Sequence, residues 1–167
     1  MKEEGTLNIL KQAILLEKRG KSFYSTAAQN SGNEAVKRFF ELMAAEEDQH
    51  VEVLSKQYRQ FQKEKTFISD ELHHDFNSDV ASEVLTEQVR QRISAAGFEA
   101  AAISAAMAME ERAIKLYSSG AEKADSPVEK ALFKWLAEWE REHLRVLSAV
   151  DRELSEKVWY DNQFWPF

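Results

Sequence analysis

The sequence contains no cysteine, which excludes disulfides, thiolate metal sites and catalysis by a thiol. It has only five glycines and two prolines in 167 residues, too few for a β protein with many turns. No apolar run approaches the ~20 residues that a membrane span requires, and residues 1–10 lack the apolar core of a signal peptide. The net charge is -7, and no basic patch is interleaved with aromatics. We therefore expect a cytoplasmic protein with neither nucleic acid nor membrane as a partner.

What the sequence does have is helical periodicity, because apolar residues recur mostly three and four positions apart. This predicts an all-α domain over residues 1–158. The first helix is expected from Thr6, as N-cap, to about residue 29, and the second, after a turn at 30–33, to about residue 65. The third is expected from about residue 94 to just before 125. Ser126 and Pro127 predict the N-cap and first residue of a fourth helix that runs to about Lys157.

A long connection, about residues 66–93, separates the two predicted hairpins, and its second half, from Val80, is expected to form a short amphipathic helix. Two helical hairpins joined by a long crossover are typical of a ferritin-like four-helix bundle.

An internal repeat supports this organisation. When residues 10–55 are aligned without gaps on residues 103–148, at an offset of 93, fourteen of 46 positions are identical. Unrelated segments of this composition would give roughly three or four. The shared positions include polar residues that an apolar helix face should lack. Those polar pairs are Glu17/Glu110, Tyr24/Tyr117, Glu47/Glu140 and His50/His143. The sequence thus indicates a duplicated helical hairpin.

The repeated polar residues have the spacing of metal ligands. Each half supplies a lone glutamate on its first helix and a Glu-x-x-His on its second. Residues three apart lie ~60° apart around a helix, so both side chains of the motif reach one point. Four carboxylates buried together would repel one another, and two divalent cations would cancel their charge. Mixed carboxylate and imidazole ligands suit two iron ions, or manganese. The predicted metal ligands are Glu17, Glu47, His50, Glu110, Glu140 and His143.

A Glu-x-x-His alone is weak evidence, and the chain contains its own control. Glu71 and His74 also have this spacing, but they lie in the crossover and have no counterpart 93 residues later. We interpret His73 and His74 as surface or linker residues. The alternative for the predicted ligands is a pair of polar residues on a solvated helix face, and the apolar residues that flank both motifs argue against it.

At these residues the chain resembles the rubrerythrins, a branch of the ferritin-like di-iron carboxylate superfamily. The resemblance covers about residues 6–157, through E17KRGKSFY24, A45EEDQH50, E110ERAIKLY117 and E138WEREH143. It implies that Glu47 and Glu140 bridge both metals. It also implies that Glu17 with His50 completes one metal position and Glu110 with His143 the other.

Tyr24 and Tyr117 each follow a predicted ligand glutamate by seven residues, or about two helical turns. Each tyrosine is therefore expected to hydrogen-bond a ligand carboxylate across the bundle, with a core tyrosine bonded elsewhere as the alternative.

The chain departs from the resemblance in two ways. Rubrerythrins that reduce peroxide usually carry an extra glutamate one turn after the third-helix ligand, whereas this chain has Ala113 there and Gly20 at the repeat-equivalent position. The four-cysteine rubredoxin module is also missing, so an external electron-donor protein is expected. The leading hypothesis is a non-haem di-iron oxidoreductase that reduces O₂ or H₂O₂. The alternatives are a ferroxidase that takes Fe(II), and a structural bundle stapled by metal.

The C-terminal segment 159–167 is unusually aromatic, with Trp159, Tyr160, Phe164, Trp165 and Phe167. Exposed aromatic patches usually mark contact surfaces. The segment is expected either to fold back over its own bundle or to dock on a second subunit. A homodimer is the assembly that the resemblance favours.

Overall fold

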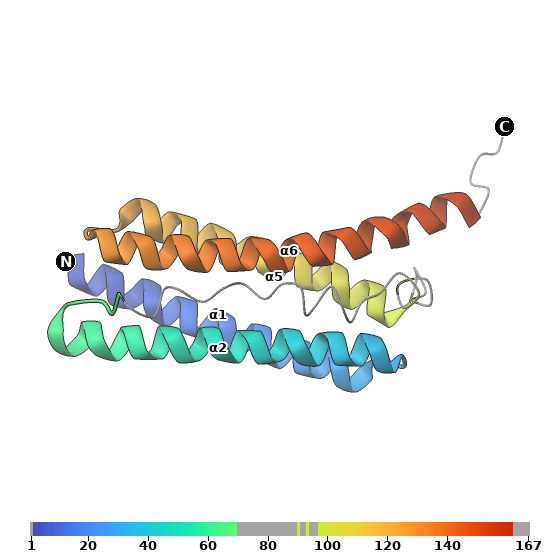
Figure 1. Cartoon of the computed structure of the whole chain (residues 1–167), viewed down its shortest axis with the longest axis horizontal. Coiled ribbons are helices and arrows are strands. Elements are labelled where there is room, and N and C mark those ends of the chain that lie inside the picture. Colours follow the sequence, from blue (N-terminus) through green and yellow to red (C-terminus); the bar gives the residue numbers. More distant parts are fainter. Residues whose placement is uncertain (1, 70–89, 91–92, 94–96, 162–167) are drawn as a thin grey trace.

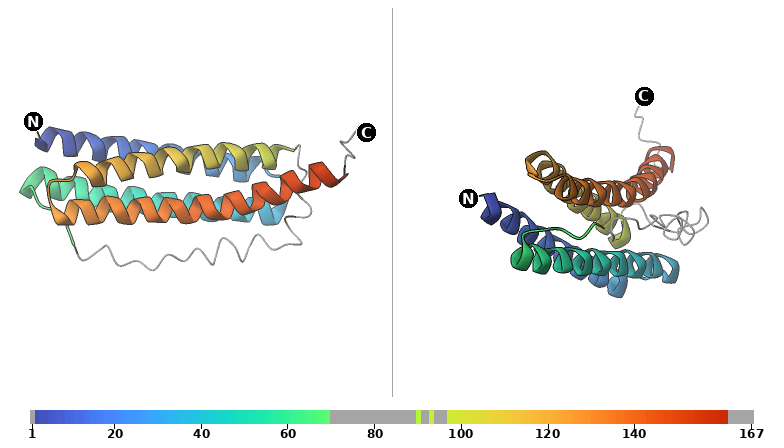
Figure 2. Two further views of the ribbon diagram at one scale, coloured as in Figure 1. Left: turned by 90° about the horizontal axis from the view of Figure 1, so that it is seen from above. Right: turned by 60° about the vertical axis from the view of Figure 1, so that its left-hand side comes forward.

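A computed structural model describes residues 2–69, 90, 93 and 97–161 of the chain. The described residues form four α-helices and no strand, which confirms the predicted all-α four-helix bundle. The helices are α1 (Lys2–Asn30), α2 (Glu34–Glu64), α5 (Phe98–Lys123) and α6 (Pro127–Asp161). Helices α1 and α2 form one antiparallel hairpin, α5 and α6 form the other, and the two hairpins lie side by side along their length (Figures 1 and 2).

The ends of the helices differ in part from the prediction. The turn before α2 is as expected, and the Asn33 side chain caps that helix by accepting from the backbone N–H groups of residues 35 and 36. Ser126 likewise accepts from the backbone N–H of Glu129, as an N-cap should. The prediction for Thr6 was wrong, because α1 begins four residues earlier, at Lys2. Helix α6 extends to Asp161, beyond the expected end near Lys157.

The hydroxyl of Thr6 has a tertiary role instead of capping a helix. It donates a 2.8 Å hydrogen bond to the buried carboxylate of Glu129 at the start of α6. At the other end of the bundle, Glu99 in the first turn of α5 accepts a 3.0 Å hydrogen bond from the backbone N–H of Gly32, between α1 and α2. The two hairpins are therefore joined by a hydrogen bond near each end.

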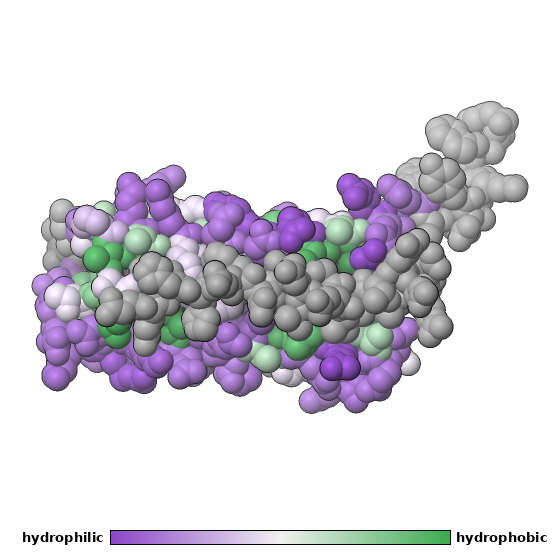
Figure 3. Space-filling view, viewed as in Figure 1, coloured by the Kyte–Doolittle hydropathy of each residue, from purple (hydrophilic) through white to green (hydrophobic). Residues whose placement is uncertain are grey.

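The apolar core consists of two clusters, and each contains residues of both hairpins. One includes Tyr24, Phe40 and Leu147, and the other includes Leu10, Tyr117 and Phe133. On the face shown in Figure 3, hydrophilic residues cover the outer sides of the helices, and hydrophobic residues gather along the line between the two hairpins. Burial of these apolar faces supplies the main stabilisation of the bundle.

Within the described part of the chain, the helices lack the continuous apolar stretch that would let one of them cross a lipid bilayer. The predicted short helix from Val80 and the aromatic residues 162–167 lie outside the described residues. Trp159 and Tyr160 lie in the last turn of α6. The expected boundary of the domain at residue 158 stays a prediction.

Candidate metal centre

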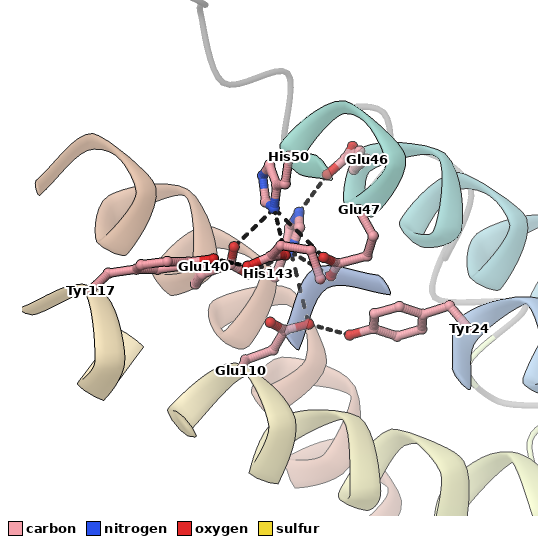
Figure 4. Close-up of polar contacts among 9 residues, drawn as sticks. Tyr24, Glu46, Glu47, His50, Glu110, Tyr117, Glu140 and His143 are labelled. Atoms are coloured by element: carbon pink, nitrogen blue, oxygen red, sulfur yellow. Dashed lines mark hydrogen bonds and ion pairs between the residues drawn. The ribbon is translucent and has the colours of Figure 1, made fainter. Parts of the chain in front are cut away.

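The six predicted ligands meet in the middle of the bundle, and all four helices contribute. One glutamate comes from α1, one from α5, and a Glu-x-x-His pair comes from each of α2 and α6 (Figure 4). Every one of these side chains belongs to a residue that is at most 4% exposed. The residues are Glu17, Glu47, His50, Glu110, Glu140 and His143.

The first group of potential ligands surrounds His50. Its Nδ1 lies 2.9 Å from Oε1 of Glu140, 3.1 Å from Oε2 of Glu17 and 3.5 Å from Oε2 of Glu47. One ligand atom from each of these four residues falls within 4.8 Å of all the others. This spacing allows the four side chains to hold one ion between them.

The second group surrounds His143 and shares two carboxylates with the first. Nδ1 of His143 lies 3.3 Å from Glu140 and 3.8 Å from both Glu47 and Glu110. Glu47 and Glu140 belong to both groups, whereas Glu17 and Glu110 each belong to one. The arrangement therefore consists of two overlapping groups of potential ligands that share two carboxylates.

Two tyrosines bind the outer glutamates across the bundle. The hydroxyl of Tyr24 on α1 donates to Glu110 on α5, and that of Tyr117 on α5 donates to Glu17 on α1. Both tyrosines are fully buried. Because each bond joins opposite hairpins, the pair holds the two lone glutamates in place at the same time.

The burial of unpartnered ligand atoms fits the presence of cations. Among the described residues, both carboxylate oxygens of Glu140 and Nδ1 of His143 are buried and make no well-aligned hydrogen bond, although Nδ1 of His50 lies 2.9 Å from Oε1 of Glu140. Buried polar atoms are nearly always hydrogen-bonded unless an ion binds them. Two divalent cations would bind these atoms and balance the four carboxylates, and oxygen and imidazole ligands suit iron or manganese. The residues present thus fit a di-metal centre.

Without a metal, the same burial perturbs the acid–base properties of the cluster. Burial raises the pKa of Glu17 and of Glu110 well above the ordinary 4.5, and the nearby Glu140 raises both further. Burial would also raise the pKa of Glu140, but His50 and His143 outweigh this and hold it far below 4.5. Burial lowers the pKa of each histidine, yet the surrounding carboxylates raise both well above 6.5. The cluster therefore binds protons where it would otherwise bind cations.

A cavity of about 290 Å³ leads to the carboxylates between α1 and α5. Its lining includes Glu17, Glu47 and Glu110, the small residues Gly20 and Ala113 and the exposed arginines Arg19 and Arg112. A Cβ added at Gly20 would lie 3.1 Å from the carboxyl carbon of Glu47. The two positions at which an extra glutamate was sought are thus small, and at Gly20 the carboxylate of Glu47 occupies the space that a side chain would need.

The sequence reasoning missed two residues that contact the histidines from outside the cluster. Glu46 lies 2.5 Å from Nε2 of His143, and the ring of Trp139 packs edge-on against that of His50, with 4.1 Å between the ring centroids. Both residues directly precede a predicted bridging glutamate, so they were adjacent to a motif already identified. Glu71 and His74, which were assigned to the linker, lie outside the described residues.

Comparison with known proteins gives one family and one related structure. The model of the family described as Rubrerythrin matches residues 8–150. The structure is also similar to that of a hypothetical protein from Pyrococcus furiosus, with a TM-score of 0.63, 24% sequence identity and 90% of each chain covered. At this identity the likeness supports the fold alone. No curated protein matches the chain.

Proposed function

The chain belongs to the rubrerythrin family, and from this membership and the buried ligand cluster we propose that it is a di-iron oxidoreductase that reduces H₂O₂ or O₂. Glu17 and His50 would hold one metal, Glu110 and His143 the other, and Glu47 and Glu140 would bridge both. The observation that carries the proposal is the pair of overlapping ligand groups that share these two carboxylates. When bound, a pair of iron ions supplies Lewis acidity and electrons for cleavage of the O–O bond.

The protein's own residues would position the metals and control access to them. The hydroxyls of Tyr24 and Tyr117 hold the outer glutamates in place, because each donates to one of their carboxylate oxygens. The apolar clusters on either side keep bulk water away from the ligands. Reduction of H₂O₂ to two waters consumes two electrons and two protons. The chain has no cysteine to hold an iron–sulfur donor, so we include an external electron-donor protein in the proposal.

The cavity can admit a small neutral substrate. It is large enough for H₂O₂ or O₂, and it reaches Glu17, Glu47 and Glu110 directly. The exposed guanidinium groups of Arg19 and Arg112 lie along the same cavity as these three carboxylates, so its lining carries side chains of both charges. The cavity therefore gives H₂O₂ or O₂ a route to the predicted ligands.

The test begins with elemental analysis of protein purified without added metal. The reduced protein is then mixed separately with O₂ and with H₂O₂ in an anaerobic stopped-flow instrument. We expect about two iron ions per chain and rapid oxidation by at least one of the two reagents. If the metal stays bound but neither reagent oxidises it, the metal has only a structural role and the proposed activity is wrong. Formation of a large shell that stores iron would favour the ferroxidase alternative.

Substitution of the bridging residues tests the ligand set. Glu47→Ala and Glu140→Ala should each abolish binding of the second metal, because each removes a carboxylate that both groups share. His74→Ala, in the predicted linker, is the matched control and should bind metal as the parent does. Equal loss in all three variants, measured by elemental analysis, would contradict the proposed assignment.

We also propose a homodimer, and the aromatic segment 159–167 is the natural place to test it. Deletion of this segment followed by light scattering separates the two roles that the sequence suggests. A smaller mass would support docking on a second subunit. An unchanged mass with a lower melting temperature would show that the segment covers its own bundle.

A further inference from the structure

The two halves of the metal centre differ at one pair of equivalent positions. At the repeat offset of 93 residues, Glu46 in the first half corresponds to Trp139 in the second. Each side chain crosses to the histidine of the opposite hairpin, so Glu46 meets His143 and Trp139 meets His50. The duplicated hairpins therefore differ in what contacts their histidines: a carboxylate contacts His143, and an indole ring contacts His50.

The carboxylate orients His143 for metal binding. Oε2 of Glu46 lies 2.5 Å from Nε2 of His143, the ring nitrogen that faces away from the cluster. A proton on Nε2 is thereby held between the two groups, and Nδ1 keeps its lone pair toward Glu140, Glu47 and Glu110. A carboxylate behind a ligating imidazole fixes its tautomer and increases its strength as a donor.

Among the described residues, no carboxylate hydrogen-bonds Nε2 of His50. Its Nε2 is buried and has no hydrogen-bond partner in the part of the chain that the structure describes. Its Nδ1 is hydrogen-bonded to Glu17 at 3.1 Å. To bind a metal through Nδ1, the neutral ring must carry its proton on Nε2. Among the described residues no carboxylate accepts that proton, and the ring contact of His50 with Trp139 is edge-on.

From this difference we propose that the two metal positions are unequal. The position completed by Glu110 and His143 binds its ion more tightly and fills first, and the position completed by Glu17 and His50 fills second. Glu46 is the positioning residue that creates the difference. This inference rests on the proposed di-metal centre, and it adds an order of loading that the symmetric ligand set alone would not have.

The experiment is an anaerobic titration of the metal-stripped protein with Co²⁺. Calorimetry measures affinity, and visible absorbance reports the coordination of each ion. We expect two binding steps at least tenfold apart. Glu46→Gln keeps the size of the side chain but removes its charge, and loss of such a partner typically weakens a metal site by about 10–100-fold. Glu41→Gln, an exposed position on the same helix, is the matched control and should leave both steps unchanged.

Two further variants assign the steps. His50→Ala should retain the tighter step, and His143→Ala should retain only the weaker one. Adding Glu46→Gln should weaken binding in the His50→Ala protein and have no effect in the His143→Ala protein. A general loss of structure would weaken both backgrounds, so this contrast isolates the role of Glu46.

The titration separates failure of this inference from failure of the proposed centre. Two Co²⁺ ions bound with equal affinity, or a tighter step that survives in His143→Ala, would overturn the proposed order and leave the di-metal centre intact. The same holds if Glu46→Gln behaves like Glu41→Gln. A parent protein that binds no Co²⁺ would remove the metal centre itself, and the order of loading with it.

Discussion

Removal of the metals should destabilise the protein strongly at neutral pH and much less at mildly acidic pH. The physical reason is the concentration of four carboxylates and two imidazoles in a core where each residue is at most 4% exposed. Cations that bind only the folded state stabilise it by mass action. Protons can replace them in part, but only where the buried groups are able to hold protons.

The pKa shifts give the sign of this pH dependence. Glu17 and Glu110 have raised pKa values in the folded state, so their contribution to stability is present below the ordinary value of 4.5 and is lost as the pH rises through the folded values. The pKa values of His50 and His143 are also raised, so their contribution to stability is present below the ordinary value of 6.5 and is lost as the pH rises through the folded values. Glu140 has a lowered pKa, so its contribution is present above 4.5 and is lost in stronger acid. The metal-free protein should therefore be more stable near pH 5.5 than at pH 7.5.

The size of the effect follows from the number of sites. An ion at 100 times its dissociation constant stabilises the folded state by about 2.7 kcal/mol, so two ions contribute about 5 kcal/mol. For a chain of this size each kcal/mol corresponds to about 2–4 °C in melting temperature, which gives about 10–20 °C at pH 7.5. At pH 5.5 protons compete for the ligands, and the difference should be smaller.

The assay compares melting curves of stripped and reconstituted protein by circular dichroism at both pH values. The chelator is removed by desalting before each measurement, so only the metal content differs. Melting temperatures that agree within about 2 °C at pH 7.5 would refute the reasoning. A larger difference at pH 5.5 than at pH 7.5 would refute the assignment of the pKa shifts to this cluster.

Two substitutions near the cluster should have distinct effects. Tyr117→Phe removes the donor to a buried carboxylate and should lower the free energy of unfolding by about 1–3 kcal/mol. Tyr58→Phe, at a half-buried position outside the ligand cluster, is the control and should lower it less. Urea unfolding measures both. Gly20→Ala would place a methyl group 3.1 Å from the carboxyl carbon of Glu47 and should weaken metal binding about tenfold in a calorimetric titration. Gly5→Ala, with no atom within 4 Å of the added carbon, should bind metal as the parent does and gain up to about 1 kcal/mol from helix propensity. Unaltered metal binding in Gly20→Ala would show that Glu47 is not constrained by this contact.

The sequence was informative about the ligands because a duplicated pattern carries its own control. Glu17 and Glu110 are unremarkable singly, but their identical placement relative to Glu47-x-x-His50 and its copy singled them out. Helical spacing then determines which side chains share a face. The fold class, the four helices and the proximity of the six residues could all be derived in this way, and the rubrerythrin family is confirmed.

The tertiary structure alone decided how the helices meet one another. Periodicity gives the angle of a side chain around its own helix, but not the rotation and shift of that helix against its neighbours, which depend on packing. Thr6 therefore looked like a cap and instead bonds Glu129 on another helix. For the same reason the sequence could not predict that Glu46 contacts His143 and that Trp139 contacts His50. The sequence shows that the two halves differ at this pair of positions, but which histidine each side chain meets depends on contacts across the bundle.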